Sequence, residues 1–295
     1  MVDGVSGVLS VDKPAGLTSH DVVARTRRLS GQRAVGHAGT LDPLATGVLV
    51  LLMGRATALA PYATAQRKIY AAEVVLGCAT ETDDAEGAVT RTAPVPSLEP
   101  GRLEAVLKSF VGSQMQQPPV YSAVKQGGVR AYARARAGTQ VELPGRPVII
   151  HSIDLLDYSD GRLTLRVETG PGTYIRSLAR DIGHRLGTAA YLHTLVRLAS
   201  GHCHLRDSVA LDHLNGDNLR HHVLPMDSVL TSLPAVFLQR EQARQARHGM
   251  AVPMARFEVV PTMGAVRLYD HQGAFFALAK PSGSRWKPFR VLDPA

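Results

Sequence analysis

A short run of apolar residues constrains the fold of this chain more than any other segment. Residues 48–54 read VLVLLMG, and none of their side chains is polar. A strand with one solvated face alternates apolar and polar residues, whereas a continuous apolar run is typical of a central strand that is buried on both faces. The sequence therefore predicts that this strand lies in the interior of a sheet.

The surrounding segments predict a mixture of strands and helices without a regular βαβ rhythm. GVLSVDKPAG is typical of a strand that runs into a turn, and Thr18 or Ser19 can cap a helix that extends to about Arg33. The pattern also predicts a strand over 68–77, a helix over 103–111, a hairpin over 147–169 around Ser159-Asp160-Gly161, and a helix within 170–187. A mixed sheet with flanking helices is the architecture that fits this order.

The composition changes after about residue 212. Residues 213–234 are expected to form a short helix and a linker, and a small helix over 240–248 follows. The segments AVRLYD and AFFALAK are typical of short strands on either side of a turn. With 295 residues the chain is long for a single core, so we expect one domain over 1–230 and a small β-rich domain over 231–295.

The charge of the chain favours a polyanionic partner. The net charge is +8, and much of it is concentrated in residues 125–147, which contain a single acid, Glu142. The cations of this segment are Lys125, Arg130, Arg134, Arg136 and Arg146. Because glycines and prolines are interspersed among them, we expect a mobile basic insertion that follows a phosphate backbone.

Several protein classes are disfavoured. No apolar run approaches the ~20 residues that span a bilayer, and the N-terminus lacks the basic and apolar regions of a signal peptide. Cys78 and Cys203 provide no disulfide framework and are compatible with a reducing cytosol. The segment HCH at 202–204 has no matching ligand pair elsewhere, so we expect no metal site. From the apolar runs, the N-terminus and the cysteines we expect no membrane association and a cytoplasmic location.

The segment GHAGTLDPLATG at residues 36–47 is a loop that is rich in small residues and contains one acid. Asp42 is the only carboxylate there, and Pro43 holds it in an extended conformation. An acid on such a preordered loop can act as a nucleophile, a general base or an electrostatic stabiliser, although an isolated Asp-Pro more often caps a turn.

Three other segments supply groups that complement this acid. They contribute, in pairs, Lys68 and Tyr70, Tyr121 and Lys125, and Tyr174 and Arg176. Each residue alone is typical of a packed tyrosine or a surface cation. Together they provide an acid, an arginine to keep it ionised, aromatic rings for a base and a basic segment, which suits chemistry on a flipped-out nucleotide.

These residues belong to longer motifs that resemble a known family. VDKPAGLTSHDVV, GHAGTLDPLATGVL, KIYAAEVVLG…TETDDAEG, QQPPVYSAVK and GTYIRSLARDIG closely resemble, in this order, bacterial tRNA pseudouridine-55 synthases of the TruB type. The resemblance covers roughly residues 5–212. It implies an α+β pseudouridine synthase fold with a mixed, mostly antiparallel central sheet. The tail resembles the family's PUA-like RNA-binding domain in length, position and β character.

The resemblance implies that the protein isomerises one uridine in the T loop of tRNA without a cofactor. Asp42 matches the essential aspartate, which attacks the target nucleotide either at C1′ or at C6 of the ring. The uracil then turns and rejoins the sugar through C5. The expected partner is the T arm of tRNA, with no obligatory protein partner, and the expected state is a monomer.

Other family positions transfer one by one. Tyr70 matches the tyrosine that stacks on the target base and is a candidate for proton removal, and Arg176 matches the arginine paired with the catalytic acid. The residues expected to contact or shape the RNA site are His37, Tyr174, Leu195, Asp84 and the motif Lys13-Pro14, which can equally brace the floor of the site. The insertion that carries Lys125, Arg130, Arg134 and Arg136 matches the family's RNA-gripping segment.

Two departures and two alternatives remain. The family often has two adjacent arginines after the pocket leucine, but this chain has Val196 and then Arg197. Valine cannot make the phosphate contact that an arginine would make at position 196. In a second departure, Glu81 stands where aspartate is common. A tRNA-binding or tRNA-folding protein without turnover would not require Asp42 and Arg176 together. The guide-RNA-dependent branch of the superfamily usually has longer, lysine-rich tails than this chain, so we expect a stand-alone enzyme.

Overall fold

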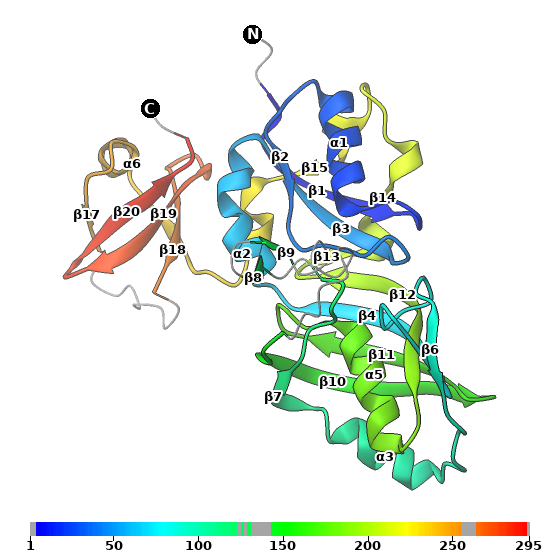
Figure 1. Cartoon of the computed structure of the whole chain (residues 1–295). Coiled ribbons are helices and arrows are strands. Elements are labelled where there is room, and N and C mark those ends of the chain that lie inside the picture. Colours follow the sequence, from blue (N-terminus) through cyan, green and yellow to red (C-terminus); the bar gives the residue numbers. More distant parts are fainter. Residues whose placement is uncertain (1–3, 123–124, 127–128, 131–142, 255–263, 294–295) are drawn as a thin grey trace.

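A computed structural model describes residues 4–122, 125–126, 129–130, 143–254 and 264–293. Within these ranges an 11-stranded sheet has the order β14-β1-β3-β12-β4-β11-β10-β7, with β2 and β13 paired to β3 and β12, and β15 paired to β1 (Figure 1). Among the strand pairs described in this sheet, β1–β14 and β3–β12 are parallel and the others are antiparallel. The sheet is therefore mixed and mostly antiparallel, as expected.

The N-terminal half of this sheet contains the strand expected to be central. Its elements are β1 (Gly7–Lys13), α1 (Ser19–Ser30), β2 (Val35–His37), β3 (Thr46–Met53), β14 (Val209–Ala210) and β15 (Val223–Leu224). Alternate side chains of β3 enter two different cores: Leu49 and Leu51 pack in the core that includes α1, whereas Val48, Val50 and Leu52 pack in a second core. The strand is thus buried on both faces.

The second half of the sheet is built from long antiparallel strands. They are β4 (Lys68–Leu76), β7 (Gly112–Gln116), β10 (Arg146–Ser159), β11 (Arg162–Thr169), β12 (Ala190–Ser200) and β13 (Cys203–His204). The helices α3 (Pro100–Lys108) and α5 (Ile175–Leu186) cover this half. Asp160 and Gly161 both have positive φ, which makes the expected two-residue hairpin turn between β10 and β11.

Two helices begin or end elsewhere than the sequence pattern predicts. The side chains of Thr18 and Asp21 form a capping box at the start of α1, but the helix ends at Ser30 rather than at Arg33. Gly31 adopts a left-handed conformation with φ of 64°, which terminates the helix. The helix expected over 103–111 spans Pro100–Lys108 instead, and Phe110 is buried from the segment that follows it.

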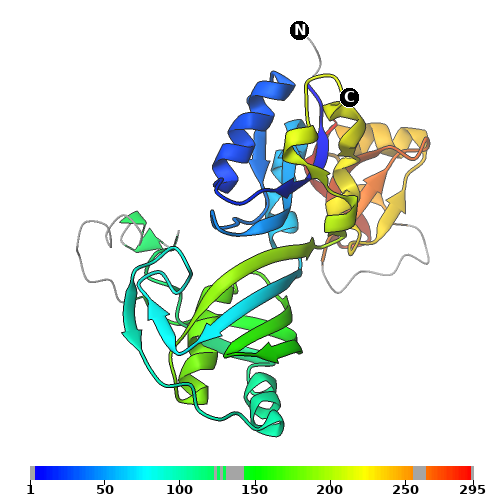
Figure 2. The same ribbon diagram turned by 90° about the vertical axis from the view of Figure 1, so that its right-hand side faces the viewer.

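The two halves of the sheet meet at a very short junction. Strands β3 and β12 pair only through Thr46–Val196 and Gly47–Arg197. Gly47 has a φ of +95°, and a Cβ atom there would lie 2.4 Å from the carbonyl oxygen of Arg197. Figure 2 shows β4 and β12 side by side as they run from the second half toward this junction. Glycine is thus required where the strands come together.

Several short elements connect these parts. They are η1 (Gly54–Leu59), α2 (Ala60–Thr64), β5 (Cys78–Thr80), β6 (Val89–Thr92), β8 (Lys125–Gln126), β9 (Val129–Arg130), η2 (Leu205–Asp207), η3 (Leu211–His213), η4 (Leu219–His222) and η5 (Met226–Leu230). The last three lie in or at the start of residues 213–234, the region expected to hold a short helix and a linker. That expectation is corrected to a series of 3₁₀ turns joined by extended segments.

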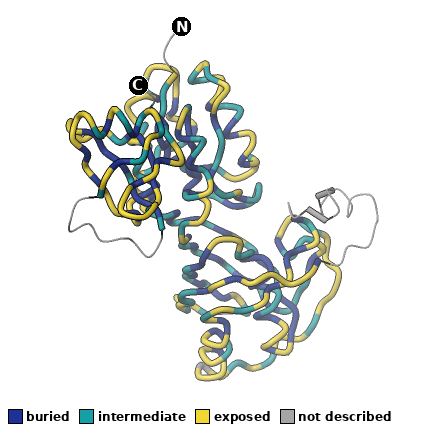
Figure 3. The backbone as a smooth tube through the Cα atoms, turned by 90° about the vertical axis from the view of Figure 1, so that its left-hand side faces the viewer, coloured by how far each residue is buried: buried dark blue, intermediate teal, exposed yellow. Residues whose placement is uncertain are grey.

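The C-terminal part forms a separate five-stranded sheet with the order β16-β18-β19-β20-β17. Its elements are β16 (Ala235–Phe237), α6 (Arg240–Arg247), β17 (Val252–Pro253), β18 (Val266–Tyr269), β19 (Phe275–Ser282) and β20 (Arg285–Val291). Phe276 and Trp286 are fully buried in its core, and Figure 3 shows both buried and exposed stretches of the backbone in this part. Leu278 joins the second core beneath β3, so this part packs against the N-terminal half. The domain division at residue 230 stays a prediction.

Candidate active site

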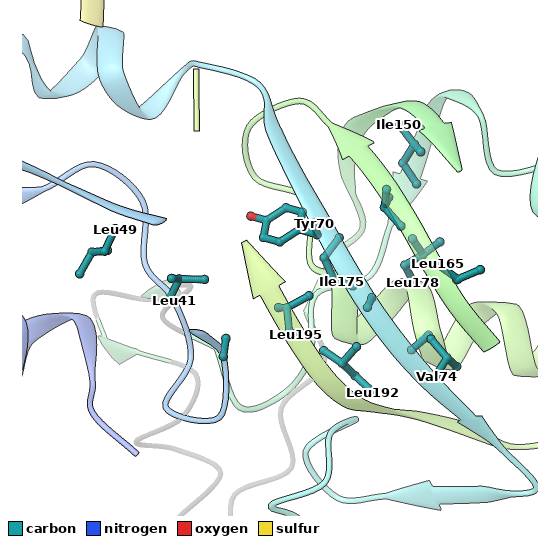
Figure 4. Packing of buried hydrophobic residues seen from close by; sticks show 14 of the residues in the cluster. Leu41, Leu49, Tyr70, Val74, Ile150, Leu165, Ile175, Leu178, Leu192 and Leu195 are labelled. Carbon is teal, nitrogen blue, oxygen red and sulfur yellow. The ribbon is translucent and has the colours of Figure 1, made fainter. Parts of the chain in front are cut away.

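A cavity of about 710 Å³ lies where the two halves of the large sheet meet. Seven of the residues predicted from the sequence line it: Asp42, Tyr70, Asp84, Tyr174, Arg176, Leu195 and His37. They come from the loop before β3, the loop between β5 and β6, the strands β2, β4 and β12, and the start of α5. Figure 4 shows Tyr70 on β4 projecting toward the loop that carries Leu41, with Leu195 on β12 nearby. Residues predicted from separate motifs are therefore brought together.

The backbone on either side of Asp42 is held in place by the segment that leads into α1. Ser19 Oγ accepts a hydrogen bond of 2.8 Å from the Leu41 amide, and the Gly16 amide donates to the Pro43 carbonyl over 2.9 Å. Leu41 is buried, whereas the side chain of Asp42 is 34% exposed. The loop is thus anchored on its inner side while the carboxylate faces the cavity.

Arg176 in the first turn of α5 pairs with two carboxylates of the cavity, those of Asp42 and Asp84. Its Nε lies 2.9 Å from Asp42 Oδ2, in an ion pair whose N–H is not aligned as a hydrogen bond. Its Nη1 lies 3.4 Å from Asp84 Oδ2 and donates to the Thr82 carbonyl over 3.0 Å, and Nη2 donates to the Tyr121 carbonyl over 3.1 Å. The guanidinium is therefore fixed at several points and holds Asp42 next to a cation.

Asp84 is a buried member of this cluster. It is 3% exposed and accepts hydrogen bonds from Thr82 Oγ1 and from the Glu86 amide. Asp84 is therefore a buried acid beside Arg176 and is not part of a solvated turn.

Glu86 also lines the cavity, which the sequence analysis did not anticipate. Burial raises the pKa of its carboxyl group, and the charges of Asp84 and Asp42 raise it further. The only signal for Glu86 in the sequence is its place in the acid-rich motif TETDDAEG.

The aromatic and apolar residues form the walls of the cavity. Tyr70 is 6% exposed and lies opposite Arg197 across the β4–β12 ladder, and Leu195 lies opposite Ala72. The backbone of Tyr174 exchanges two hydrogen bonds with the Gln116 side chain, and burial raises the pKa of its phenol. Burial also lowers the pKa of His37, and Arg197 lowers it further, so its imidazole is neutral at pH 7.

Arg197 is a buried cation rather than a surface arginine. It is 1% exposed, and its guanidinium donates to the carbonyls of Val48 over 2.6 Å, Thr40 over 3.3 Å and Gly39 over 3.1 Å. These acceptors lie before and after Asp42 in the chain. Arg197 therefore clamps the Asp42 loop to β12, a role that the sequence analysis missed.

Lys13 holds the loop that carries Asp42 from its buried side. It is fully buried, is not among the residues that line the cavity, and donates to the carbonyls of Pro14, Leu17 and Pro43. Burial lowers its pKa to about 8, although the nearby Asp42 acts in the opposite direction. Of the two roles considered for the Lys13-Pro14 motif, these contacts favour bracing the floor of the site.

The predicted basic insertion lies mostly outside the described residues. Lys125 and Arg130 face each other in the short β8–β9 ladder, and Arg134 and Arg136 fall outside the described residues. Within the described ranges, no cluster of three or more His, Cys, Asp or Glu side chains could hold a metal ion. None of the helices described is both long and apolar enough to cross a membrane.

Comparison with known proteins identifies the family of the chain. Residues 27–175 match the family described as TruB family pseudouridylate synthase (N terminal domain), and residues 176–231 match the tRNA pseudouridylate synthase B C-terminal domain. The chain is 38% identical over 293 residues to tRNA pseudouridine synthase B of Dehalococcoides mccartyi, covering 98% of this chain and 97% of that one. It is 41% identical over 295 residues to the protein of the same name from Thermobifida fusca, covering 97% and 98% respectively.

A solved structure shows the same fold. The crystal structure of a Cbf5-Nop10-Gar1 complex contains a chain that matches with a TM-score of 0.72 and 25% identity, over 98% of this chain and 85% of that one. The expected fold class is thereby confirmed, as is the family inferred from the sequence motifs. The chain belongs to the TruB family of pseudouridylate synthases.

Proposed function

We propose that this protein isomerises uridine to pseudouridine at position 55 in the T loop of tRNA, without a cofactor and in the cytoplasm. The family membership and the name tRNA pseudouridine synthase B, carried by relatives that align over nearly the whole chain, support this substrate and reaction. The observation that carries the proposal is the Asp42 carboxylate, which faces the cavity and is paired with Arg176 over 2.9 Å.

Asp42 acts as the nucleophile on a flipped-out nucleotide. Its carboxylate attacks the target either at the sugar C1′, which releases the uracil, or at C6 of the ring. A carboxylate suits the first route because a departing base leaves positive, oxocarbenium-like charge on the sugar. In both routes the N1–C1′ bond breaks, the uracil turns, and C5 forms a new bond to C1′. The bond between Asp42 and the nucleotide then breaks and restores the carboxylate, and the proton on C5 is lost while N1 gains one. No atoms or electrons are exchanged overall, so the reaction needs no redox cofactor.

The walls of the cavity keep the detached base close to the sugar. Tyr70 and Leu195 are nearly buried and present apolar surface from neighbouring strands. A uracil that stacks on Tyr70 and packs against Leu195 can turn without escaping, and the apolar surface excludes water that would otherwise capture the sugar. Arg176 pairs with Asp42 over 2.9 Å and orients its carboxylate toward the nucleotide.

A substitution at Asp42 tests the proposal. Asp42→Asn keeps the shape of the side chain but removes the negative charge, so it should abolish tritium release from C5-labelled uridine in a T-arm stem-loop while RNA binding persists. The matched control is Asp212→Asn, which affects an exposed ion pair with Arg25 and should leave the rate unchanged. Appreciable turnover by Asp42→Asn would remove Asp42 from the nucleophile role. A wild-type protein that binds the stem-loop but never releases tritium would instead favour a tRNA-folding protein without turnover.

A further inference from the structure

The charges that line the cavity are separated into two parts. Asp42, Asp84 and Glu86 gather around Arg176. Lys68 and Arg197 form the other part, and both lie beside Gly39: a Cβ atom on Gly39 would lie 3.5 Å from Lys68 Cε and 3.7 Å from Arg197 Nη1. The mechanism above uses the first part and leaves the second without a ligand.

Lys68 and Arg197 are both buried and have no carboxylate partner among the described residues. Lys68 is 5% exposed, and its Nζ donates to the carbonyls of Thr64 and Gln66, each over 2.6 Å. Arg197 likewise donates only to backbone carbonyls of the described chain. Carbonyl dipoles offset a buried charge incompletely, so two neighbouring cations favour the arrival of an anion.

The electrostatics of Lys68 agree with this geometry. Burial, and after it the positive charge of Arg197, lower its pKa to about 8, and no acid acts in the opposite direction. Lys13 differs in this respect because Asp42 partly compensates its charge. At pH 7 Lys68 still carries its proton. An ammonium group has three donors, of which two bind carbonyls, so one remains for a ligand in the cavity.

We propose that Lys68 and Arg197 bind a phosphodiester group that adjoins the target nucleotide. This inference rests on the proposed function. A nucleotide whose sugar lies at Asp42 carries one phosphodiester on its 5′ oxygen and another on its 3′ oxygen. Gly39, which Lys68 and Arg197 flank, lies only three residues before Asp42. Lysine and arginine are the side chains that bind phosphate through charge-assisted hydrogen bonds.

This interaction has a specific use in the reaction. When the uracil has left C1′, its own contacts no longer hold the sugar in the site. A phosphodiester bound by Lys68 and Arg197 keeps the sugar at Asp42 while the base turns. The interaction thus contributes to binding the target nucleotide and to the recapture of the base.

Neutral backbone linkages test the inference directly. A T-arm stem-loop is prepared with a methylphosphonate at the linkage on the 5′ or the 3′ side of the target uridine, which removes one charge at a time. One of the two should lower wild-type affinity at pH 7 by about tenfold, the effect of removing a hydrogen bond to a charged group. Lys68→Met should bind unmodified RNA about tenfold more weakly and lose nothing further with the same neutral linkage.

Three controls make the result specific. Lys108→Met changes an exposed lysine of α3 and should keep the full sensitivity to the linkage. Lys68→Arg keeps the charge and should also keep this sensitivity, which separates removal of the charge from a folding defect. A methylphosphonate several nucleotides away should affect wild type and Lys68→Met equally.

The inference is overturned if the neutral linkages weaken Lys68→Met as much as they weaken wild type, or if neither weakens wild type. In these binding measurements every protein, including the one called wild type, also carries Asp42→Asn, so that no turnover occurs. Absence of tritium release from the enzyme without Asp42→Asn would contradict the proposed function but not the phosphodiester interaction.

Discussion

The Nε atom of Arg176 lies 2.9 Å from Oδ2 of Asp42, although 134 positions separate the two residues in the chain. The same guanidinium also reaches Asp84 and two backbone carbonyls. Arg176 therefore sets the position of the acid relative to both halves of the sheet as well as balancing its charge.

Replacing the guanidinium of Arg176 by the ammonium group of lysine should separate the effect of positioning Asp42 from the effect of a nearby positive charge. Arg176→Lys retains the positive charge but cannot make all four contacts, so the single-turnover rate of pseudouridine formation should fall by about a hundredfold, the usual effect of a misplaced catalytic group. RNA affinity should change little. Arg180→Lys is the matched control, because Arg180 lies one turn further along α5 and pairs with Asp83 over 2.8 Å. Equal losses in the two variants would contradict the positioning role of Arg176.

Arg197 should contribute to both stability and rate. Arg197→Met leaves the carbonyls of Gly39, Thr40 and Val48 without their donor, so the free energy of unfolding in urea should fall by at least about 3 kcal/mol. Since these carbonyls flank Asp42, the rate should fall even under conditions in which the variant is fully folded. Arg25→Met, which breaks an exposed ion pair with Asp212, should change stability by only about 0–1 kcal/mol. A folded Arg197→Met enzyme with the wild-type rate would show that the clamp does not act on Asp42.

The junction between β3 and β12 should tolerate no side chain at Gly47. Gly47→Ala imposes a left-handed conformation on alanine and a clash with the Arg197 carbonyl, which together should destabilise the protein by about 2–5 kcal/mol. Gly31→Ala is a control for the conformation alone: it has a φ of 64° and open space around it, and should lose about 1–2 kcal/mol. Similar unfolding midpoints for the two variants would show that the close approach at Gly47 is not tight in solution.

The affinity for RNA should depend on pH through Lys68. Its pKa is lowered to about 8, so the ammonium is present below that pH and is lost as the pH rises through it. A bound phosphodiester prefers the charged form, and binding of the stem-loop should weaken above pH 8. The guanidinium of Lys68→Arg stays charged, so this variant should bind with a flatter pH profile between 7 and 9. A wild-type profile as flat as that of the variant would count against a charged interaction.

The basic segment at residues 125–147 should bind phosphates outside the cavity. Arg134→Gln combined with Arg136→Gln should weaken RNA binding and reduce the slope of log affinity against log salt by about 0.7–0.9 for each phosphate that the variant no longer neutralises. Catalysis on saturating RNA should be unaffected. The measurement is a salt titration of stem-loop binding, and an unchanged slope would refute the assignment.

Local signals in the sequence anticipated much of the architecture. The apolar run at 48–54 marked β3, the candidate caps Thr18 and Ser19 marked the start of α1, and Ser159-Asp160-Gly161 marked the β10–β11 turn. Each signal arises from neighbouring residues, through steric limits on the backbone, local hydrogen bonds or hydrophobic periodicity. The end of α1 was misjudged because a left-handed Gly31 outweighed the continuing pattern.

The sequence by itself determined the family and the fold class and predicted the pairing of Asp42 with Arg176, because these residues lie in contiguous motifs. Only the tertiary structure decided which charges are neighbours. Arg197 is a buried clamp, Asp84 is buried beside Arg176, and Lys68 lies next to a second cation without an acid among the described residues. Burial and charge pairing depend on strands that are brought together from more than a hundred residues apart, and no local pattern encodes that distance.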